Sequence, residues 1–171
     1  MAGKVIGKSM NYGFAGNYGR TPDDIVADRK LADNSQAIPF GCAIALKSDN
    51  TYTAVGAGFT AAQFAGIALR VVKQAISYAD QNYAEYEPGK MCSALQRGAA
   101  TVVVGRGTPT AGGKVYVRIT ANASYPNAIV GGFEATADGS NTVEIPNAKW
   151  TNGYVDANGI AEVTLLTRVN P

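Results

Sequence analysis

Short apolar runs separated by turn residues fill the chain from Ile38 onward, and this pattern predicts the elements of the fold. A run IPFGCAIAL ends in a polar KSDN turn, and similar runs then recur at short intervals: TYTAVG, MCSALQ, TVVVG, KVYVRIT, GGFEAT, TVEIPNAKW and GIAEVTLLTRV. Strands at such regular spacing, with no long helical segment between them, are typical of antiparallel sandwiches and barrels. The sequence therefore predicts a mainly β protein, a compact antiparallel β-barrel or sandwich over residues 36–171.

Dipeptides that end in glycine indicate where the chain turns between these strands. Pro88-Gly89 and Arg97-Gly98 each predict a turn, because proline presets one backbone angle and glycine accepts conformations that other residues avoid. Asp138-Gly139 is typical of a β-hairpin. The last third of the chain is therefore expected to run as strands joined by tight connections.

The segment FTAAQFAGIALRVVKQAISYADQ fits two patterns at once. Phe64, Ile67, Val71 and further apolar residues lie at helical spacing. Glycine interrupts that stripe, however, and alternate residues from Ala65 also form one face of a strand with β-branched members. We predict a strand over residues 64–72, with a helix as the alternative.

Residues 1–35 differ in texture, because glycine, polar and acidic residues disperse the apolar ones. We predict an extended N-terminal arm over residues 1–35, followed by the β domain over residues 36–171. Tyr12, Phe14 and Tyr18 are its aromatic anchors, and exposed aromatic side chains of this kind are suited to docking on another surface. A disordered tail is the alternative.

The stretch TVVVGRGTPTAGGKVYVRIT resembles a phosphate-binding loop but fails its spacing. Such a loop needs lysine directly after the second glycine of the motif and then serine or threonine. Here Gly113 occupies the lysine position, and Lys114 is followed by Val115 and a strand pattern rather than a helix N-terminus. We interpret the stretch as two strands flanking a loop, with Lys114 facing solvent or a neighbouring subunit.

Composition limits the partners of the chain. Charged residues make up 16% of its 171 residues, the net charge is +2, and the basic residues are scattered, so no nucleic-acid partner is expected. No segment approaches the roughly 20 apolar residues of a membrane span, and no secretory signal is visible, so we expect a soluble protein without a membrane partner. Cys42 and Cys92 are expected to be buried, reduced thiols.

Histidine is absent, which removes the commonest general base near neutral pH and excludes most catalytic triads. Carboxylate pairs remain weak catalytic candidates: Asp23 with Asp24, Glu85 with Glu87, and Asp156. The DANG segment at Asp156 lacks the other features of a calcium loop and predicts a turn. We therefore expect no enzyme activity, no catalytic residues, no cofactor, no metal and no small-molecule substrate. Trp150 and the tyrosines leave open a sugar-binding surface, with core or interface packing favoured.

In order and spacing, several motifs are similar to those of a known family. The motifs are IPFG, FAGIALR, YEPGKMCSALQRG, AGGKVYVR, GGFEA, DGSNTVEIPNAKW and DANGIAEVTLLTR. Together they span nearly everything from about residue 14 to the end of the chain. The chain resembles the structural cement proteins of tailed-phage and prophage capsids. It departs from them in a longer arm and in the segment KQAISYADQNYAEYEP.

This resemblance implies a non-enzymatic capsid decoration protein that binds the outer surface of the phage head and stabilises it. It implies the major capsid protein as partner, a homotrimer between capsomers, assembly in the host bacterial cytoplasm and a location in the virion. For the interface, the expected residues are Tyr12, Phe14, Tyr18 and Arg20, with Lys114 and Trp150 as further candidates. A carbohydrate-binding β-sandwich module and another virion subunit, of the tail or the head shell, are the alternatives.

Overall fold

The structure is a computed structural model, and it describes residues 11–71 and 83–167. Nearly all of its regular structure is extended, and the two helical elements are single 3₁₀ turns. The elements are β1 (Tyr18–Lys30), β2 (Ile38–Pro39), β3 (Ala43–Leu46), β4 (Tyr52–Ala54), η1 (Ala61–Gln63), β5 (Phe64–Ala68), β6 (Glu85–Tyr86), β7 (Met91–Val103), β8 (Lys114–Arg118), β9 (Phe133–Glu134), η2 (Gly139–Asn141), β10 (Thr142–Trp150) and β11 (Ile160–Leu165).

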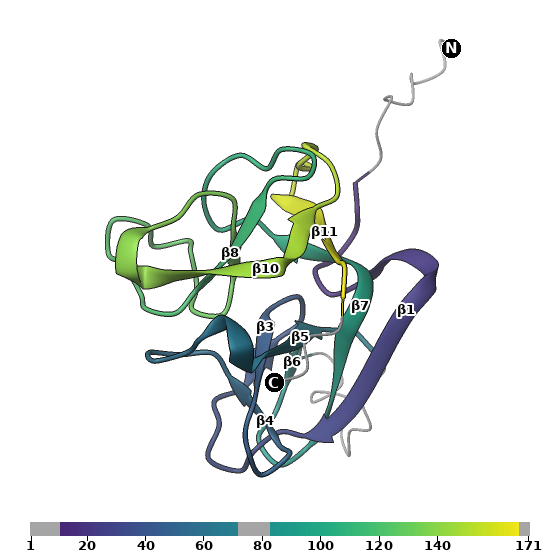
Figure 1. The fold of residues 1–171 in the computed structure, drawn as a ribbon, viewed down its shortest axis with the longest axis vertical. Helices are drawn as coiled ribbons and strands as arrows, with labels where there is room; N and C mark the ends of the chain where they lie inside the picture. Colours follow the sequence, from purple (N-terminus) through teal and green to yellow (C-terminus); the bar gives the residue numbers. More distant parts are fainter. Residues whose placement is uncertain (1–10, 72–82, 168–171) are drawn as a thin grey trace.

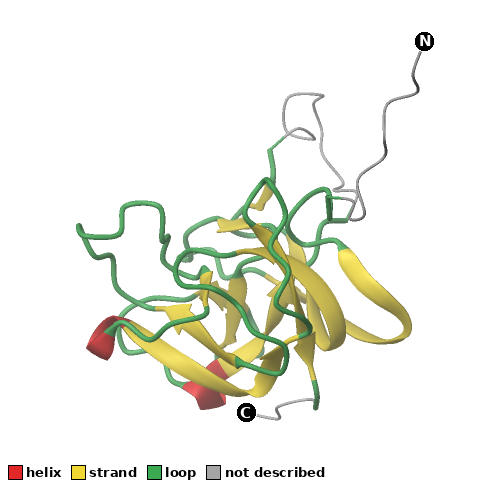
Figure 2. Ribbon diagram, turned by 90° about the horizontal axis from the view of Figure 1, so that it is seen from above, coloured by secondary structure: helices red, strands yellow, loops and turns green. Residues whose placement is uncertain are grey.

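Nine of the strands form one antiparallel sheet, in the order β4-β3-β5-β7-β11-β10-β8-β9, with β1 paired to β7 outside this path. β2 and β6 form a separate two-stranded sheet. The large sheet curls (Figure 1), and the view from above shows its strands arranged around an interior (Figure 2). The prediction of a mainly β, antiparallel fold is confirmed, and the sheet has the form of a half-barrel.

β7 is the strand that joins the two halves of the sheet. Its N-terminal part pairs with β1 and β5, and its C-terminal part pairs with β11. Two isolated bridges bring the curled sheet back on itself. Leu31, directly after β1, bridges to Tyr52 of β4, and Val104, directly after β7, bridges to Phe133 of β9.

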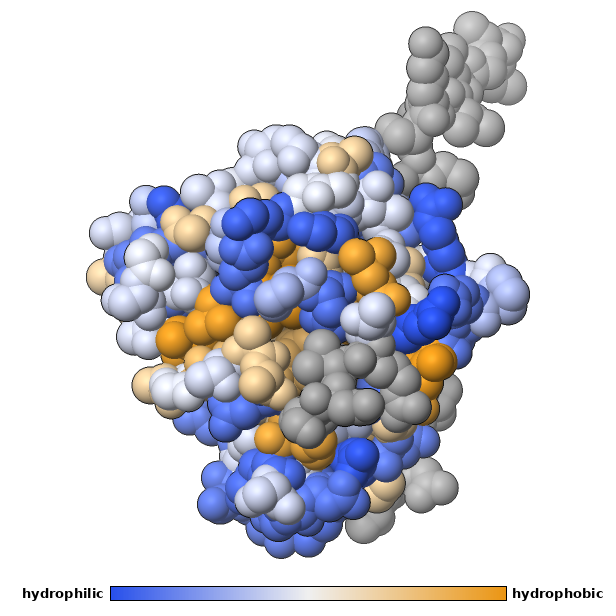
Figure 3. All heavy atoms as spheres, in the orientation of Figure 1, coloured by the Kyte–Doolittle hydropathy of each residue, from blue (hydrophilic) through white to orange (hydrophobic). Residues whose placement is uncertain are grey.

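Apolar side chains pack on both faces of the β3-β5-β7 layer. The larger cluster lies between this layer and the strands β8, β10 and β11 and includes Phe64, Leu95 and Trp150. The smaller cluster covers the opposite face and includes Tyr52 and Tyr86. An apolar patch is visible at the seam between the β3-β4 half and the β8-β10 half (Figure 3). Ala61 of η1 and Val143 of β10 are partly buried and pack against the larger cluster.

β5 confirms the predicted strand over residues 64–68, while the end of that prediction, Val72, lies outside the described residues. All five residues of β5 are buried, because both faces of the strand meet apolar clusters. Gly66 explains the interruption in the helical stripe. A Cβ at this position would lie 2.1 Å from the carbonyl oxygen of Leu95, so β5 approaches β7 too closely for any side chain.

Two predicted connections are wrong. Arg97-Gly98 is not a turn, since β7 continues through it from Met91 to Val103; Gly98 has φ +113° where the backbone of Asp23 comes close. Asp138-Gly139 does not close a hairpin, because η2 joins β9 to β10 and these two strands lie on opposite sides of β8. Both dipeptides contain a glycine that permits a turn, but the pairing of the strands around them determines which backbone conformation each adopts.

The sequence predicts an extended arm over residues 1–35, and the structure shows residues 18–30 of this range as β1, hydrogen-bonded to β7. Leu31, which follows β1, is fully buried. Residues 1–10 lie outside the described residues. The segment of interest for binding is therefore residues 11–20, called the N-terminal segment below, which runs into the first part of β1.

Candidate functional site

The N-terminal segment is fixed on β7 by hydrogen bonds to both the side chain and the backbone of Thr101. The hydroxyl of Thr101 donates to the carbonyl oxygen of Phe14 at 2.7 Å and accepts from the backbone N–H of Asn17 at 3.1 Å. The backbone N–H of Gly16 donates to the carbonyl oxygen of Thr101 at 2.7 Å. Thr101 is 2% exposed, so these contacts satisfy polar groups that the segment itself removes from water.

Tyr12 attaches the start of this segment to the turn between β10 and β11. Its backbone N–H donates to Asp156 Oδ2 at 2.9 Å, its hydroxyl lies 3.0 Å from Asn152 Nδ2, and its ring packs against Tyr154 at 5.7 Å between centroids. The other oxygen of Asp156 accepts the N–H groups of Asn158 and Ile160 within the DANG turn, as the sequence predicts for a turn. Asp156 therefore binds backbone groups of its own chain.

Two glycines allow the segment to lie close to the β2-β3 connection. A Cβ on Gly16 would lie 2.9 Å from the backbone N of Gly41, and a Cβ on Gly41 would lie 2.7 Å from Ala15 Cβ. Both glycines also have positive φ, +82° and +78°. Only glycine fits such a contact, because it combines a left-handed backbone with an approach that excludes side chains.

Arg20 ends the segment with an ion pair to β11. Its Nε lies 2.7 Å from Glu162 Oε1, and this hydrogen bond raises the pKa of Arg20. The carboxylate of Glu162 is 4% exposed while the Arg20 side chain is 67% exposed. Arg20 therefore neutralises a buried carboxylate of its own chain and keeps part of its guanidinium in solvent.

Phe14 and Tyr18 are the two aromatic residues of the segment that are exposed to solvent. Phe14 is 62% exposed and Tyr18 is 42% exposed. The guanidinium of Arg70 lies 4.0 Å from the centre of the Phe14 ring, a cation–π contact that holds the ring in place. Exposed aromatic rings on a fixed backbone are the residues of this region best suited to contact a partner.

The two remaining interface candidates differ in exposure. Lys114, at the start of β8, is 60% exposed and forms an ion pair with Glu144 of β10 at 2.9 Å. Trp150 is 1% exposed and lies in the larger apolar cluster, so its ring has no face to offer to a sugar or to a partner. Its burial agrees with the core packing that the sequence favours.

The glycine-rich loop before β8 serves packing rather than phosphate binding. A Cβ on Gly107 would lie 2.3 Å from the hydroxyl of Thr136, and one on Gly113 would lie 2.6 Å from the hydroxyl of Thr110. The backbone N–H of Gly112 donates to the carbonyl oxygen of Trp150. Because the loop turns back against its own chain between two strands, the interpretation as a strand connection is confirmed.

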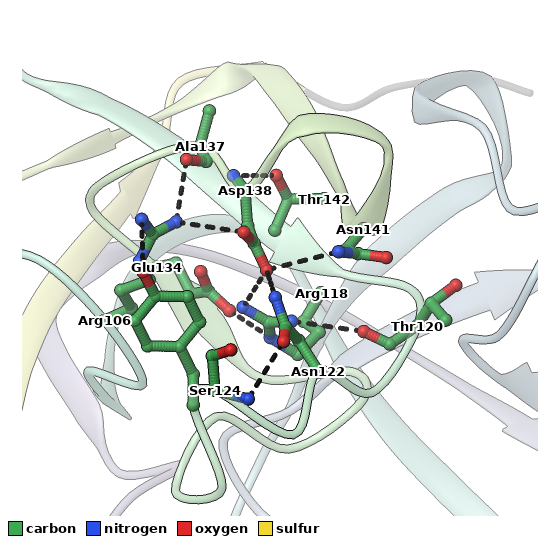
Figure 4. Close-up of polar contacts among 11 residues, drawn as sticks. Arg106, Arg118, Thr120, Asn122, Ser124, Glu134, Ala137, Asp138, Asn141 and Thr142 are labelled. Atoms are coloured by element: carbon green, nitrogen blue, oxygen red, sulfur yellow. Dashed lines mark hydrogen bonds and ion pairs between the residues drawn. The ribbon is translucent and has the colours of Figure 1, made fainter.

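A buried ionic network beneath the β8-β9 loop was not predicted (Figure 4). Arg118 of β8 is fully buried; its Nε donates to Glu134 Oε1, and its Nη2 lies 3.0 Å from Asp138 Oδ2. Asn122 donates to the same Asp138 oxygen at 2.9 Å, and Arg106 lies 3.5 Å from the other one. The hydrogen bond from Asn122, followed by those from Arg118 and Asn141, holds the pKa of Asp138 below its ordinary value.

This network fixes the long loop between β8 and β9 rather than presenting reactive groups. Arg106 donates to Ala137 O and to the hydroxyl of Tyr125, and its guanidinium stacks on the Tyr125 ring at 4.1 Å. The strand pattern KVYVRIT assigns Arg118 to a polar, solvent-facing side. The signal for burial was the pair of acids, Glu134 and Asp138, that follow within twenty residues, but only the tertiary structure brings them together.

Among the described residues, no group of three potential metal ligands is found. No helix within residues 11–71 and 83–167 is long and apolar enough to cross a membrane. Cys42 and Cys92 are buried free cysteines, and burial raises the pKa of each thiol to about 12. Of the carboxylate candidates, Asp23 forms an ion pair with Arg97 at 3.0 Å, while Glu85 lies in β6.

Comparison with known proteins gives consistent results at the level of sequence family and of fold. The model of a family described as structural cement protein (E217 gp24/Pam3 gp6) matches residues 3–166. A chain in the solved structure of the capsid of Myoviridae phage XM1 has a similar fold, with a TM-score of 0.65 and 16% sequence identity over 99% of this chain and 100% of that chain. No curated protein matches the sequence.

Proposed function

The chain belongs to the structural cement protein family, and from this premise we propose that it binds the outer surface of an assembled phage head, as a trimer between capsomers, and stabilises the shell. The match over residues 3–166 carries the proposal, because it includes the N-terminal segment and every strand of the β domain. The likeness to a chain of a phage capsid supports it at the level of the fold.

The physical features of the chain suit a subunit that stabilises a shell by binding to many equivalent sites on it. Its body is a curled sheet with two apolar clusters and a buried ionic network, which together resist deformation. A protein that binds many equivalent sites on a shell needs only a modest interface per copy, because the contributions add over the lattice. We propose the major capsid protein as the partner and the virion as the location.

For the capsid contact we propose the exposed rings of Phe14 and Tyr18, with Lys114 as a further contact. Tyr12 and Arg20 act differently in this proposal, because they hold the N-terminal segment in place through Asp156 and Glu162. Removing Tyr12 or Arg20 would weaken binding indirectly, by releasing the backbone that carries the two rings.

Co-sedimentation with heads of the phage that encodes this chain, purified without the protein, tests the proposal. The wild-type chain is expected to pellet with these heads and to raise the temperature at which they release DNA. Replacing Phe14 and Tyr18 together by alanine is expected to reduce pelleting, whereas Ile129→Ala, which removes another exposed apolar side chain, serves as the matched control. Failure of the wild-type chain to pellet would contradict the proposed function.

Truncation separates the N-terminal residues from the segment that folds onto the sheet. A deletion of residues 1–20 would remove the partners of Thr101 and Glu162 and damage the β domain. A deletion of residues 1–10 leaves these contacts in place. If that deletion lowers head binding while thermal unfolding stays unchanged, the first ten residues contribute to the interface; unchanged binding would remove them from the proposal.

A further inference from the structure

A row of residues crosses five neighbouring strands of the large sheet, and each residue is the register partner of the next. In strand order, as the strands follow one another in Figure 1, the row is Lys114 of β8, Lys149 of β10, Thr164 of β11, Ala99 of β7 and Arg20 of β1. Register partners in a ladder point to the same face of a sheet. The row, called the cross-strand row below, therefore brings together three cations that lie far apart in the sequence.

The cross-strand row lies on the face of the sheet that points away from the core. The adjoining row, which is fully buried in the larger apolar cluster, consists of Trp150, Val163 and Ala100. Neighbouring residues of a strand point to opposite faces. β1 is irregular around Arg20, with register shifts on both sides. The ion pair with Glu162 nevertheless fixes the direction of Arg20, because Glu162 lies on the same face of β11, two residues before the row.

The carboxylates of this face lie below its cations. In the pair of Arg20 with Glu162, the side chains are 67% and 4% exposed. In the pair of Lys114 with Glu144, they are 60% and 35% exposed. Lys149 is partly buried and forms no ion pair with the described residues. A molecule that approaches the face therefore meets the cations first, although two of the three are paired.

Lys149 and Lys114 place like charges directly opposite each other. The N–H of Trp150 donates to Gly113 O at 3.2 Å beside this pair, which is the pattern of a non-hydrogen-bonded pair with Cα atoms about 4.5 Å apart. Like charges in such a pair reduce the stability of the ladder, and Glu144 offsets only one of the two. A partner anion would offset the other, and arrangements that cost the free chain stability are typical of functional surfaces.

The negative charges on β1 lie at the other end of the row from the two lysines. Burial, followed by the charges of Asp24 and Asp28, raises the pKa of Tyr18, and all three residues belong to β1. From β8 to β1 the row crosses four strand spacings, about 19 Å. Three cations over this length suit a few carboxylates on a folded protein, and they are too few to hold a nucleic-acid backbone.

We propose that the cross-strand row docks on an acidic patch of the shell protein. Carboxylates of that patch lie beside the two lysines and against the guanidinium of Arg20, whose bond to Glu162 uses Nε. Its two Nη groups form no bond with the described residues and suit a bidentate contact. The row adjoins the proposed capsid contact, because Thr101, which binds Phe14, follows it on β7. This docking rests on the proposed function, to which it adds an acidic partner surface and Lys149 as a contact residue.

Two substitutions separate binding from folding. Lys149→Gln is expected to weaken binding to heads purified without the protein by about tenfold and to lessen its salt dependence. The urea midpoint of the free chain is expected to stay equal or rise, because the like-charge pair is relieved. Lys90→Gln, at an exposed position without an ion pair to the described residues, is the matched control and is expected to change neither.

The two proposals fail in different ways in this experiment. If the wild-type chain pellets with heads and Lys149→Gln binds as tightly as Lys90→Gln, the cross-strand row is not the contact and the proposed function stands. A wild-type chain that does not pellet contradicts the proposed function and this docking with it.

Zero-length cross-linking identifies the partner group. A carbodiimide joins a lysine amine to a carboxylate in direct contact, and mass spectrometry of the digested complex locates the new amide. Lys149 or Lys114 is expected to be joined to an aspartate or glutamate of the shell protein, and the amide between Lys114 and Glu144 serves as internal control. Complexes in which these two lysines are joined only to a second copy of the chain, or in which all links to the shell start from other lysines, overturn the proposal.

Discussion

The hydroxyl of Thr101, near the C-terminal end of β7, donates to the carbonyl oxygen of Phe14 at 2.7 Å and thereby attaches the N-terminal segment to β7. The same hydroxyl accepts from Asn17 N–H. One side chain thus determines whether the rings of Phe14 and Tyr18 are presented on a fixed backbone.

Replacing Thr101 by valine keeps the shape of the side chain and removes both hydrogen bonds. Two backbone groups then lose their partner in a site 2% exposed, so we expect a loss of about 1–2 kcal/mol in the free energy of unfolding. We also expect faster amide hydrogen exchange over residues 14–17. Thr108→Val, at an exposed position, provides the control. Unchanged exchange in the variant would show that other contacts hold the segment.

Gly66→Ala is expected to destabilise the chain severely, because its Cβ would lie 2.1 Å from Leu95 O and the backbone has φ +149°. A shift of β5 away from β7 would open both apolar clusters, and we expect a loss of about 4 kcal/mol or failure to fold. Gly56→Ala adds the same methyl group where nothing lies within 4 Å. Thermal unfolding of the two variants should therefore differ strongly; similar midpoints would contradict the close approach.

Glu134→Gln leaves the buried guanidinium of Arg118 with one carboxylate fewer in an environment that excludes water. Breaking one partner of a buried pair is costly, and we expect a loss of about 3 kcal/mol. Glu144→Gln breaks the exposed pair with Lys114 and is expected to cost under about 1 kcal/mol. Urea unfolding measures both. A smaller effect at Glu134 than at Glu144 would mean that the network does not support the fold.

The lowered pKa of Asp138 predicts how stability responds to acid. Because the folded chain holds this carboxylate ionised to lower pH than the unfolded chain does, its contribution is complete above the ordinary aspartate pKa of about 4. That contribution is lost as pH falls below about 4, through the lowered folded value. In Asp138→Asn, the urea midpoint should therefore fall less steeply between about pH 4 and pH 2. Equal slopes would exclude Asp138 as a source of the acid sensitivity.

The thiols of Cys42 and Cys92 are expected to be unreactive in the folded protein, because burial raises the pKa of each to about 12. At pH 8 a disulfide reagent is expected to label no cysteine in the native chain and both cysteines in guanidinium, since only the thiolate reacts. Rapid native labelling would indicate that the smaller apolar cluster opens.

The sequence predicted the strands better than the way they pair. Alternation along KVYVRIT and the turn at Pro88-Gly89 depend on neighbouring residues, and both are present as predicted. The continuation of β7 through Arg97-Gly98 depends instead on β1 and β11, which lie far away in the sequence. A glycine that permits a turn also permits a bulge beside a close backbone, and only tertiary contacts decide between the two.

The candidate site shows the same limit. The sequence predicted aromatic anchors near the N-terminus, but it did not predict which of them would be packed against the chain itself. Tyr12 packs on Tyr154, whereas Phe14 is exposed to solvent. Arg118 lies at a polar position of the alternating strand pattern, and yet it is fully buried, because the β8-β9 loop folds over it. Patterns within one strand report on that strand's faces, and they contain no information about a distant loop that covers one of them.

The position of β7 also has a consequence for the order in which the chain folds. β1 and β5 are synthesised first, but both pair with β7, which leaves the ribosome much later, and Lys30 meets Met91 only then. Long-range pairings of this kind delay folding, because the intervening loop must close before any contact forms. The first half of the sheet therefore keeps an unpaired edge until residues 91–103 are synthesised, and the second half joins β7 only after β11, residues 160–165, has followed.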